Sequence, residues 1–513
     1  MSKNHVLAMY DIAGKQEFIF RHSTIKQIIG ASNIIRDLFK DYLFPSAEQY
    51  KKYSTGCKDR AIYDYTAIGS NNQPFSLKEF EDHIENDGYI GEVIYEGGGN
   101  FLILYKDEST CVEINKIFTR KILENIGSLR VICTYIDVEL DEEKSDFKKD
   151  RDMLYVKHRI NQNKFPASLV ANSMPFTQIE TETSMPLSYM EYHAERVGKE
   201  KLSLEGHAKY KKYYSLLQSE KNNFGEKLLE NLIYKKYEDS MLAVIFIDGN
   251  NMGAQVQQCL KGKKNYSECI NELRRFSSKI QKEYVEDRIE AITKDINSLD
   301  NKNEWNKEIL HRFVVSAGDE MSFIVPARLA YKAIEAYFKD LPEDDSACAG
   351  VAIFHSHSPY HEAYKIAEEC CENCKSLMKK NRETDSCYFD FHLCQGGLGM
   401  SLDTIRTKDH EDGIISRPWL IRGKSKTNQP SINEIKRVLS DLKCIGSRTT
   451  IKDLVTAAKQ SQAEFVLNVM RIYAHQPDDI KKNIEYTFKD LSGKYRRKLI
   501  YDIGIIYDEW FRW

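Results

Sequence analysis

Short apolar runs rich in Val, Ile and Phe recur along the chain, and each is followed by glycine, asparagine or an acid. Runs of this length and composition predict buried β-strands that end in tight turns. The first such strand ends at Asp11 and Gly14, and a helical stretch follows it. Two further strands turn at residues 97–100, GGGN, and a helix over 109–126 leads to a closing strand over 131–140. The pattern predicts a β-α-β-β-α-β unit in this part of the chain.

The same order of elements returns in the second half of the chain. An apolar strand ends at Asp248, a hairpin turns at residues 317–320, AGDE, and a closing strand begins at Cys348. Self-similarity at this scale indicates a duplicated unit. The sequence therefore predicts an α+β fold with two ferredoxin-like palm domains, a helical insert between them and a helical bundle at the C-terminal end.

The domain boundaries follow from these patterns. Residues 1–140 are predicted to form the first palm, which is degenerate because its hairpin carries no acid. Residues 141–241 form the insert, residues 242–430 the second palm, and residues 431–513 the helical domain, where apolar residues recur at helical spacing. The aromatic end of the chain, including Trp510 and Trp513, is expected to dock on that helical bundle.

The insert is strongly charged. We interpret it as a solvated helical segment, with an RNA-binding surface as the alternative. Its lysines include Lys199, Lys201, Lys209, Lys211 and Lys212.

Composition narrows the class of protein. The chain has 513 residues, 42% of them hydrophobic, and a formal net charge of −3, so any nucleic-acid contact must come from local patches. No apolar run approaches the ~20 residues of a membrane span, and no signal peptide is recognisable. The scattered cysteines are expected to be reduced thiols of a cytoplasmic protein. Cys371, Cys374, Cys387 and Cys394 could form a zinc set, but buried free thiols are the favoured interpretation.

The candidate chemistry lies in three carboxylates. If the strand that ends at Asp248 pairs with the hairpin strands, Asp248 lies beside Asp319 and Glu320. Carboxylates held together repel one another, and a hard divalent cation relieves that repulsion. Two ions about 4 Å apart can stabilise the attacking and leaving oxygens of an in-line displacement. The pattern predicts a Mg²⁺ or Mn²⁺ site of a nucleotidyl-transferring palm, with Asp248, Asp319 and Glu320 as metal ligands and catalytic residues.

As a set, these motifs resemble the large palm-domain subunit of type III CRISPR effector complexes. The resemblance rests on DIAGKQEFIF, IIGASNII, YEGGGNFLIL, DGNNMG and AGDE, and it covers both palms and the C-terminal tail. It implies two nucleotide-cyclase-like palms that face each other across an ATP-binding cleft. It also implies that the second palm, related to the GGDEF cyclases, makes cyclic oligoadenylate, a second messenger of antiviral defence, when the complex binds target RNA.

The resemblance also assigns residues to the nucleotides. Gly318 would let the triphosphate approach the backbone, and Lys375 would meet a phosphate. The nucleotide-binding residues expected around the second palm are Gly249, Asn250, Asn251, Gly253, Gly318 and Lys375. Those expected in the first palm are Ser32, Gly98, Gly99 and Asn100.

The chain departs from the family pattern in several places. Ala317 replaces the first glycine of the Gly-Gly-Asp-Asp turn, Glu320 replaces its last aspartate, and Asn250 stands where many relatives have a second Asp. No His-Asp dipeptide occurs in the sequence, and the insert has no cysteine. The sequence therefore resembles a shortened member without the HD nuclease and without the zinc site between the palms.

Three function classes remain open. The chain could be a nucleotidyltransferase that converts ATP to cyclic oligoadenylate with release of pyrophosphate, a free-standing cyclase with another product, or a catalytically silent scaffold that binds nucleotide or RNA. The partners implied are ATP, guide and target RNA and the other CRISPR effector subunits, with no membrane. Base specificity, activator and oligomeric state are left open by the sequence.

Overall fold

The computed structural model describes residues 4–55, 60–66, 74–97, 100–141, 143–164, 176–192, 199–219, 228–233, 239–298, 311–394, 399–409, 413–445, 447–488 and 494–511. These residues form two compact units. The first comprises Met1–Glu226, Met252–Lys282 and Ala317–Asp319. The second comprises Lys227–Asn251, Glu283–Ser316 and Glu320–Trp513.

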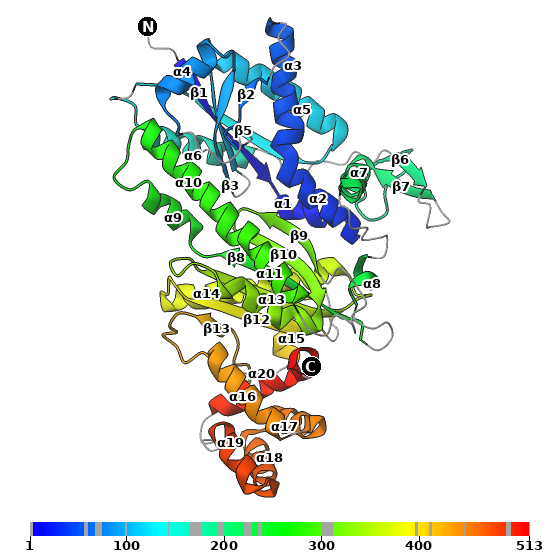
Figure 1. Cartoon of the computed structure of the whole chain (residues 1–513). Coiled ribbons are helices and arrows are strands. Elements are labelled where there is room, and N and C mark those ends of the chain that lie inside the picture. Colours follow the sequence, from blue (N-terminus) through cyan, green and yellow to red (C-terminus); the bar gives the residue numbers. More distant parts are fainter. Residues whose placement is uncertain are drawn as a thin grey trace. The chain divides into compact units, whose positions relative to one another are not determined.

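A five-stranded sheet with the order β2-β3-β4-β1-β5 organises the first unit (Figure 1). Its strands are β1 (Asn4–Ala13), β2 (Ile62–Tyr63), β3 (Gly91–Gly97), β4 (Asn100–Tyr105) and β5 (Arg130–Glu139). The helices of this unit are α1 (Lys15–Phe20), α2 (Ile25–Leu38), the π-helical η1 (Phe39–Leu43), α3 (Phe44–Thr55), α4 (Leu77–Glu85), α5 (Glu108–Asn125), α6 (Phe147–Lys164), α7 (Leu204–Ser219), α9 (Met252–Cys259) and α10 (Tyr266–Ile280).

A six-stranded sheet with the order β13-β12-β11-β8-β10-β9 organises the second unit. Its strands are β8 (Met241–Gly249), β9 (Arg312–Ala317), β10 (Glu320–Pro326), β11 (Ala347–His355), β12 (Cys387–Leu393) and β13 (Trp419–Arg422). The helices of this unit are α8 (Leu228–Leu232), η2 (Gln281–Glu286, which begins in the first unit), α11 (Asp287–Asn297), α13 (Ala327–Lys339), α14 (Tyr360–Asn381), α15 (Leu402–Asp409), α16 (Ile432–Cys444), α17 (Arg448–Gln460), α18 (Gln462–His475), α19 (Asp478–Phe488), α20 (Lys494–Ile505) and η3 (Tyr507–Phe511).

The predicted duplication is confirmed by strand order. β5-β1-β4-β3 in the first sheet and β11-β8-β10-β9 in the second have the same succession of fourth, first, third and second strands. This succession is that of the ferredoxin-like β-α-β-β-α-β unit. The first sheet adds β2 next to β3, and the second adds β12 and β13 next to β11. The predicted α+β fold with a helical C-terminal region is therefore confirmed.

The segment over α9 and α10 packs within the first unit, although it follows β8 in sequence. The side chain of Asn265 caps α10 by accepting from the Glu268 N–H. The buried face of α10, with Ile270 and Leu273, joins a core cluster that includes Leu7 and Leu104 of the first sheet. The compact units thus do not follow the order of the chain, and the predicted domain boundaries stay predictions.

The insert differs from the expectation of a solvated helical segment. It contains α6, α7 and α8, and also an antiparallel pair of strands, β6 (Leu187–Tyr192) and β7 (Lys199–Ser203). Lys209, expected in a solvated face, is fully buried on α7, where its ammonium donates to Glu205 at 2.6 Å. Gly30 lets α2 approach α7 at this point, because a Cβ there would lie 2.0 Å from the Lys209 carbonyl oxygen. Because α7 packs this closely against α2, it buries residues whose charge would predict exposure to solvent.

The expected position of Trp510 was also wrong. The ring of Trp510 is 5% exposed and lies 5.1 Å from Phe391 of β12, centroid to centroid, and 6.0 Å from Tyr331 of α13. The aromatic end therefore packs on the elements of the second palm. Trp513 lies outside the described residues.

Candidate active site

The second sheet brings two carboxylates together at one edge. Asp248 is the last acid of β8, and its Cα partner on the neighbouring strand is Glu320, the first residue of β10. The preceding residues Leu242–Ile247 are all buried, so the charge appears only where the strand reaches the sheet edge. A central strand needs apolar residues along its length, and its end is where a functional acid can be presented.

Helix α14 carries a lysine to this edge. The Lys375 ammonium forms an ion pair with the Asp248 carboxylate and donates to the Gly249 carbonyl oxygen at 3.1 Å. Burial lowers the pKa of Lys375, but the neighbouring Asp248 charge outweighs this effect and leaves the pKa above its ordinary value. Lys375 was predicted to meet a phosphate; here its acceptor is the acid that was predicted to hold metal.

Gly350 explains how α14 comes so close to the sheet. A Cβ on Gly350 of β11 would lie 1.8 Å from the Ala367 carbonyl oxygen and 2.5 Å from the Cys371 backbone nitrogen, both in α14. Backbone atoms cannot move away as a flexible side chain can, so only glycine allows this packing. The close approach of α14 fixes the position from which Lys375 reaches Asp248.

Tyr364 of α14 holds the second carboxylate. Its hydroxyl donates to Glu320 Oε1 at 3.1 Å, and its ring packs edge-on against Phe246 of β8 with centroids 5.5 Å apart. Burial and then the Glu320 charge hold the pKa of Tyr364 well above its ordinary value, so the hydroxyl remains a donor. No sequence motif pointed to Tyr364, although it lies eleven residues before Lys375 on the same predicted helix after the closing strand.

The hairpin turn between β9 and β10 contains Gly318 and Asp319. Gly318 has φ of 65°, the left-handed region that glycine adopts without strain. The turn residues Ala317–Asp319 cluster with the first unit, whereas Asp248 and Glu320 belong to the second. Within the first unit, burial, then Tyr155, then the Asp319 charge raise the pKa of Tyr95 to about 12. Asp319 adjoins Glu320 in the chain, and its role as a metal ligand remains a prediction.

The residues after Asp248 make a tight bend. The Asn250 N–H donates to the Ser346 carbonyl at 2.9 Å, and Asn250 Nδ2 donates to the Ser386 carbonyl at 3.4 Å. Asn251 has φ of 57°, which is uncommon outside glycine but tolerated by asparagine. Asn250 therefore holds the backbone at the sheet edge. Gly253 is the second residue of α9 in the first unit, with no atom within 4 Å of its Cβ position.

The donor set suits a hard divalent cation, although it is not preassembled. No group of three or more His, Cys, Asp or Glu side chains is arranged to hold a metal in the part of the chain that the structure describes. Mg²⁺ nevertheless needs only one or two protein carboxylates besides substrate phosphates and water. Asp248 and Glu320 provide two on paired strands, and the Lys375 ammonium shows that a cation is accommodated beside Asp248. The oxygen donors therefore fit Mg²⁺ or Mn²⁺.

The cysteines near this edge are thiols. Cys371 and Cys374 are fully buried, and Cys371 Sγ donates to the Cys348 carbonyl at 3.3 Å. The cysteines in the described ranges are all free. The preference for buried thiols over a zinc set agrees with this burial.

The first palm has an acid at the corresponding position. Asp11 of β1 has Asn100 of β4 as its cross-strand partner. Its carboxylate accepts from Gln162 Nε2 at 3.0 Å and lies 3.3 Å from His158 Nε2, both on α6. Burial raises the pKa of Asp11, but these hydrogen bonds and the charge of Lys15 outweigh it and leave the pKa below its ordinary value. His158 and Gln162 were missed because nothing in the sequence relates them to Asp11.

The other residues predicted for the first palm have mixed outcomes. Ser32 lies on α2 and is 9% exposed, which leaves little of it accessible to a ligand. Asn100 lies opposite Asp11, the position that Glu320 has relative to Asp248 in the second sheet. Gly98 and Gly99 lie outside the described residues. Nucleotide binding by this palm stays a prediction.

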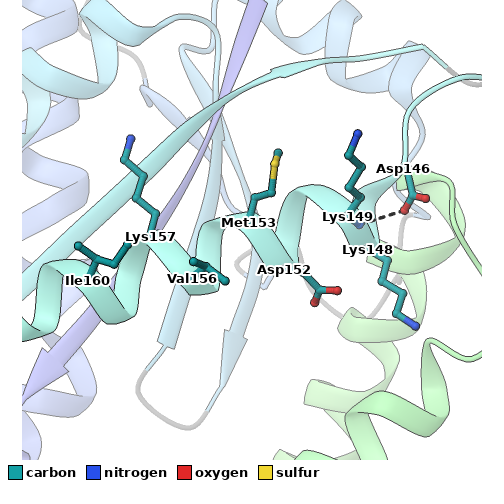
Figure 2. A pocket seen from close by; sticks show the side chains of 8 residues that line it. All are labelled: Asp146, Lys148, Lys149, Asp152, Met153, Val156, Lys157 and Ile160. Carbon is teal, nitrogen blue, oxygen red and sulfur yellow. Dashed lines mark hydrogen bonds between the residues drawn. The ribbon is translucent and has the colours of Figure 1, made fainter.

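A shallow pocket on the outer face of α6 involves different residues. Figure 2 shows Met153, Val156 and Ile160 along the helix, together with Lys149 and Lys157. This face is distinct from the face that carries His158, which is 3% exposed. The pocket includes none of the predicted site residues.

None of the helices described is long and apolar enough to cross a membrane.

Comparison with known proteins agrees with this geometry. Residues 241–384 match the family model of Cas10/Cmr2, second palm domain. No curated protein sequence matches the chain. The crystal structure of Csm1 in T. onnurineus has a TM-score of 0.50 at 13% identity, over 98% of this chain and 69% of that one.

Two Csm1–Csm4 structures give the same result. The Csm1-Csm4 cassette in complex with pppApApA has a TM-score of 0.50 at 13% identity, and the matched regions cover 98% of this chain and 69% of that one. The cassette in complex with cA3 has a TM-score of 0.50 at 14% identity, over 98% and 70%. The family resemblance predicted from the motifs is confirmed: residues 241–384 match the second palm domain of Cas10/Cmr2, and the fold of the chain is similar to that of Csm1.

Proposed function

We propose that this chain is the palm subunit of a type III CRISPR effector complex and that its second palm joins ATP molecules into cyclic oligoadenylate. Each bond would form when the ribose hydroxyl of one nucleotide attacks the α-phosphate of another and pyrophosphate leaves. The observation that carries the proposal is the pairing of Asp248 with Glu320 at the edge of a Cas10/Cmr2-type second palm, with Lys375 beside them.

Asp248 and Glu320, with the adjacent Asp319, would hold Mg²⁺ or Mn²⁺. When bound, such a cation lowers the pKa of a coordinated hydroxyl and neutralises charge on the phosphate. The chain's own residues position the nucleotide. Tyr364 keeps Glu320 in place through its hydrogen bond, and Gly318 would let phosphate oxygens approach the hairpin backbone.

Lys375 would change its ion-pair partner from the Asp248 carboxylate to a nucleotide phosphate. In the absence of ligand its ammonium neutralises Asp248, which is otherwise an uncompensated carboxylate at a sheet edge. Once a divalent cation takes that role, the ammonium can bind a phosphate oxygen of the nucleotide. Catalysis of this type depends mainly on positioning and electrostatic stabilisation, which agrees with the lack of an evident general base among these residues.

The partners belong to the proposal too. Related Csm1 proteins have been crystallised with Csm4, with pppApApA and with cA3. By analogy we propose ATP as substrate and other effector subunits, guide RNA and target RNA as partners of this chain.

One observation favours a second candidate, a silent scaffold that binds nucleotide without turnover. The Asp248–Lys375 ion pair satisfies Asp248 without any metal. A catalytically silent palm could retain such a pair for stability alone.

Product analysis separates the two candidates. Purified protein is incubated with each nucleoside triphosphate and Mg²⁺ or Mn²⁺, with and without RNA, and the products are identified by mass spectrometry. We expect oligoadenylate from the parent and none from the Asp319→Ala/Glu320→Ala variant, with unchanged thermal unfolding. The Glu343→Ala/Asp344→Ala variant, which removes an adjacent exposed pair of acids in the second unit, is the matched control. Undiminished product from the first variant would remove this site from the mechanism.

A further inference from the structure

Two basic segments that are far apart in sequence meet at the sheet edge that carries Asp248. The first is the end of α14, and the second is the loop after β13. We call their five exposed cations the basic rim, which consists of Lys379, Lys380, Arg382, Lys424 and Lys426.

Strand register places both segments at this edge. Gly249, which follows Asp248, pairs with Ala347 at the start of β11. β12 runs parallel to β11 and therefore begins at the same edge, where Cys387 pairs with Arg422 at the end of β13. The last turn of α14 leads directly into β12. The rim and the candidate active site therefore share one edge of one sheet.

Hydrogen bonds hold the loop against the end of α14. The Lys426 N–H donates to Glu383 Oε1 at 2.7 Å, and Lys426 Nζ donates to the Arg382 carbonyl at 2.7 Å. Asn381 Nδ2 donates to Thr427 Oγ1 at 3.0 Å. The two basic segments are thus fixed relative to each other, and their charges form one surface.

The structure shows no acidic partner for the rim cations among the residues that it describes. No carboxylate among the residues that the structure describes forms an ion pair with any of the five rim cations, whereas Lys375 pairs with Asp248. Glu383, the nearest acid in sequence, is 8% exposed and accepts from the Tyr388 hydroxyl and the Lys426 N–H. The exposed acids nearby are Glu372 and Asp385, together with Glu343 and Asp344 of the loop that packs against Arg422. The five cations outnumber these acids and are gathered at the end of α14 and in the loop after β13, an arrangement that suits a polyanion.

We propose that the basic rim binds the phosphate backbone of a short single-stranded oligonucleotide next to the active site. Lys379 lies one helical turn beyond Lys375 and Arg382 nearly two, about 6 and 10 Å along the axis. The rim therefore extends away from the place where a triphosphate would meet Lys375. It consists of cations without exposed aromatic residues, so it recognises phosphates and not bases. Binding stands independently of turnover; the role of the rim in holding the growing product chain rests on the proposed function.

Binding is measured by fluorescence anisotropy of a labelled oligoadenylate hexamer with the full chain, without metal or nucleotide. Each phosphate contact on a single strand contributes about −0.7 to the slope of log affinity against log salt, so five contacts predict about −3.5. Between 50 and 200 mM salt the parent should lose about 100-fold in affinity. A Lys379→Gln/Lys424→Gln/Lys426→Gln variant should have a slope of about −1.4 and lose less than about tenfold over that range.

A matched control distinguishes the effect of removing rim lysines from the effect of lowering the total positive charge. Lys332→Gln/Lys443→Gln/Lys459→Gln removes the same charge from exposed lysines elsewhere in the second unit, and it should bind the hexamer as the parent does. An oligouridylate hexamer should bind as well as the oligoadenylate. Equal binding by the rim variant and the parent, or an equal loss in the control variant, would overturn the proposal. So would much tighter, rim-dependent binding of a long RNA, since the occupant would then be an RNA partner.

The rim variant also separates this proposal from the proposed function. With ATP and Mg²⁺ it should release shorter oligoadenylate products than the parent. If no protein makes product while the rim variant still loses hexamer binding, the proposed function fails and the binding site stands. Unchanged product lengths in a variant that has lost hexamer binding would remove the rim from chain extension.

Discussion

The two palms of this chain place an aspartate at the same point of the same topology, but they surround it differently. Asp11 has the amide Asn100 as its cross-strand partner and accepts hydrogen bonds from α6. Asp248 has the acid Glu320 as its partner and pairs with a lysine of α14. The same strand position thus occurs in two electrostatic environments. In the first palm the carboxylate accepts hydrogen bonds from an amide and a histidine, whereas in the second it forms a pair of carboxylates that attracts a cation.

On the proposed function, the comparison attributes activity to very few residues. Ferredoxin-like folds host many activities, so topology alone does not distinguish the palms. The palms are distinguished by the hairpin residue opposite each aspartate, Asn100 or Glu320, and by the helix side chain of Lys375.

The largest effect is expected when the second site is made to resemble the first. Glu320→Gln places an amide opposite Asp248, as Asn100 lies opposite Asp11. Loss of a metal ligand should remove several kcal/mol of transition-state stabilisation, so we expect at least a ~100-fold drop in oligoadenylate formation. Rates of product formation are compared with those of Glu320→Asp, which retains the charge and should retain measurable activity. Equal rates for the Gln variant and the parent would show that the second carboxylate is not needed.

The next effect concerns the helix that supplies Lys375. Gly350→Ala forces the new Cβ against the α14 backbone, so α14 must move. Overpacking of this kind costs about 1–3 kcal/mol, and product formation should fall with the displacement of Lys375. Denaturant unfolding and product assays measure both. Gly253→Ala is the control for unfolding alone, because its Cβ position is open and the helix should gain stability. It does not control the product assay, since Gly253 is one of the expected nucleotide-binding residues. A Gly350→Ala variant as stable and active as the parent would contradict the packing account.

Substitution of Lys375 should have a moderate effect, with opposite consequences for metal binding and nucleotide binding. Lys375→Met leaves Asp248 without its cation, so Mn²⁺ affinity in the absence of nucleotide should rise. The same change removes a phosphate contact worth about 1.4 kcal/mol, so the KM for ATP should rise about tenfold. Isothermal titration with Mn²⁺ and steady-state kinetics test the two parts, and Lys375→Arg should recover the KM. A weaker Mn²⁺ affinity in the Met variant would mean that Lys375 supports the metal site instead of competing for it.

The smallest effect is expected when the first site is made to resemble the second. Asn100→Glu sets a carboxylate opposite Asp11, and like charges directly opposite on paired strands cost about 0.2–1 kcal/mol. Thermal unfolding should show a lower Tm that added Mn²⁺ restores. Asn100→Gln, which adds length without charge, should show neither change. A Tm of the Glu variant that does not respond to Mn²⁺ would indicate that His158 and Gln162 exclude a cation from Asp11.

The sequence predicted much of the second palm because its evidence is local. The apolar strand that ends at Asp248 and the Gly-Asp-Glu hairpin each lie within a dozen residues, and strand pairing then sets Glu320 opposite Asp248. The repeated order of elements likewise predicted a second copy of the unit, with Asp11 retained and no acid in its hairpin. Lys375 was expected at the site from the resemblance, but its ion pair with Asp248 was not.

What the sequence could not predict depends on contacts distant in the chain. His158 and Gln162 reach Asp11 from α6 across about 150 residues, and a charged helix gives no sign of such a partner. Lys209 sits in a segment whose composition indicates solvent, yet close packing against Gly30 buries it. The same holds for α10, which follows β8 in sequence but completes the core of the first unit. Composition reports on the segment, whereas burial depends on what packs against it.

The central claim, that the two aspartates differ in function because their partners differ, is tested most directly by one matched pair of substitutions. Asp11→Asn and Asp248→Asn remove the same charge from the same strand position of each palm. Oligoadenylate formation from ATP and Mg²⁺ is measured for both, with thermal unfolding as the check on folding. The account predicts that Asp248→Asn abolishes product, whereas Asp11→Asn retains a rate within a few-fold of the parent. Equal loss in both variants, or product from Asp248→Asn at the parental rate, would contradict it.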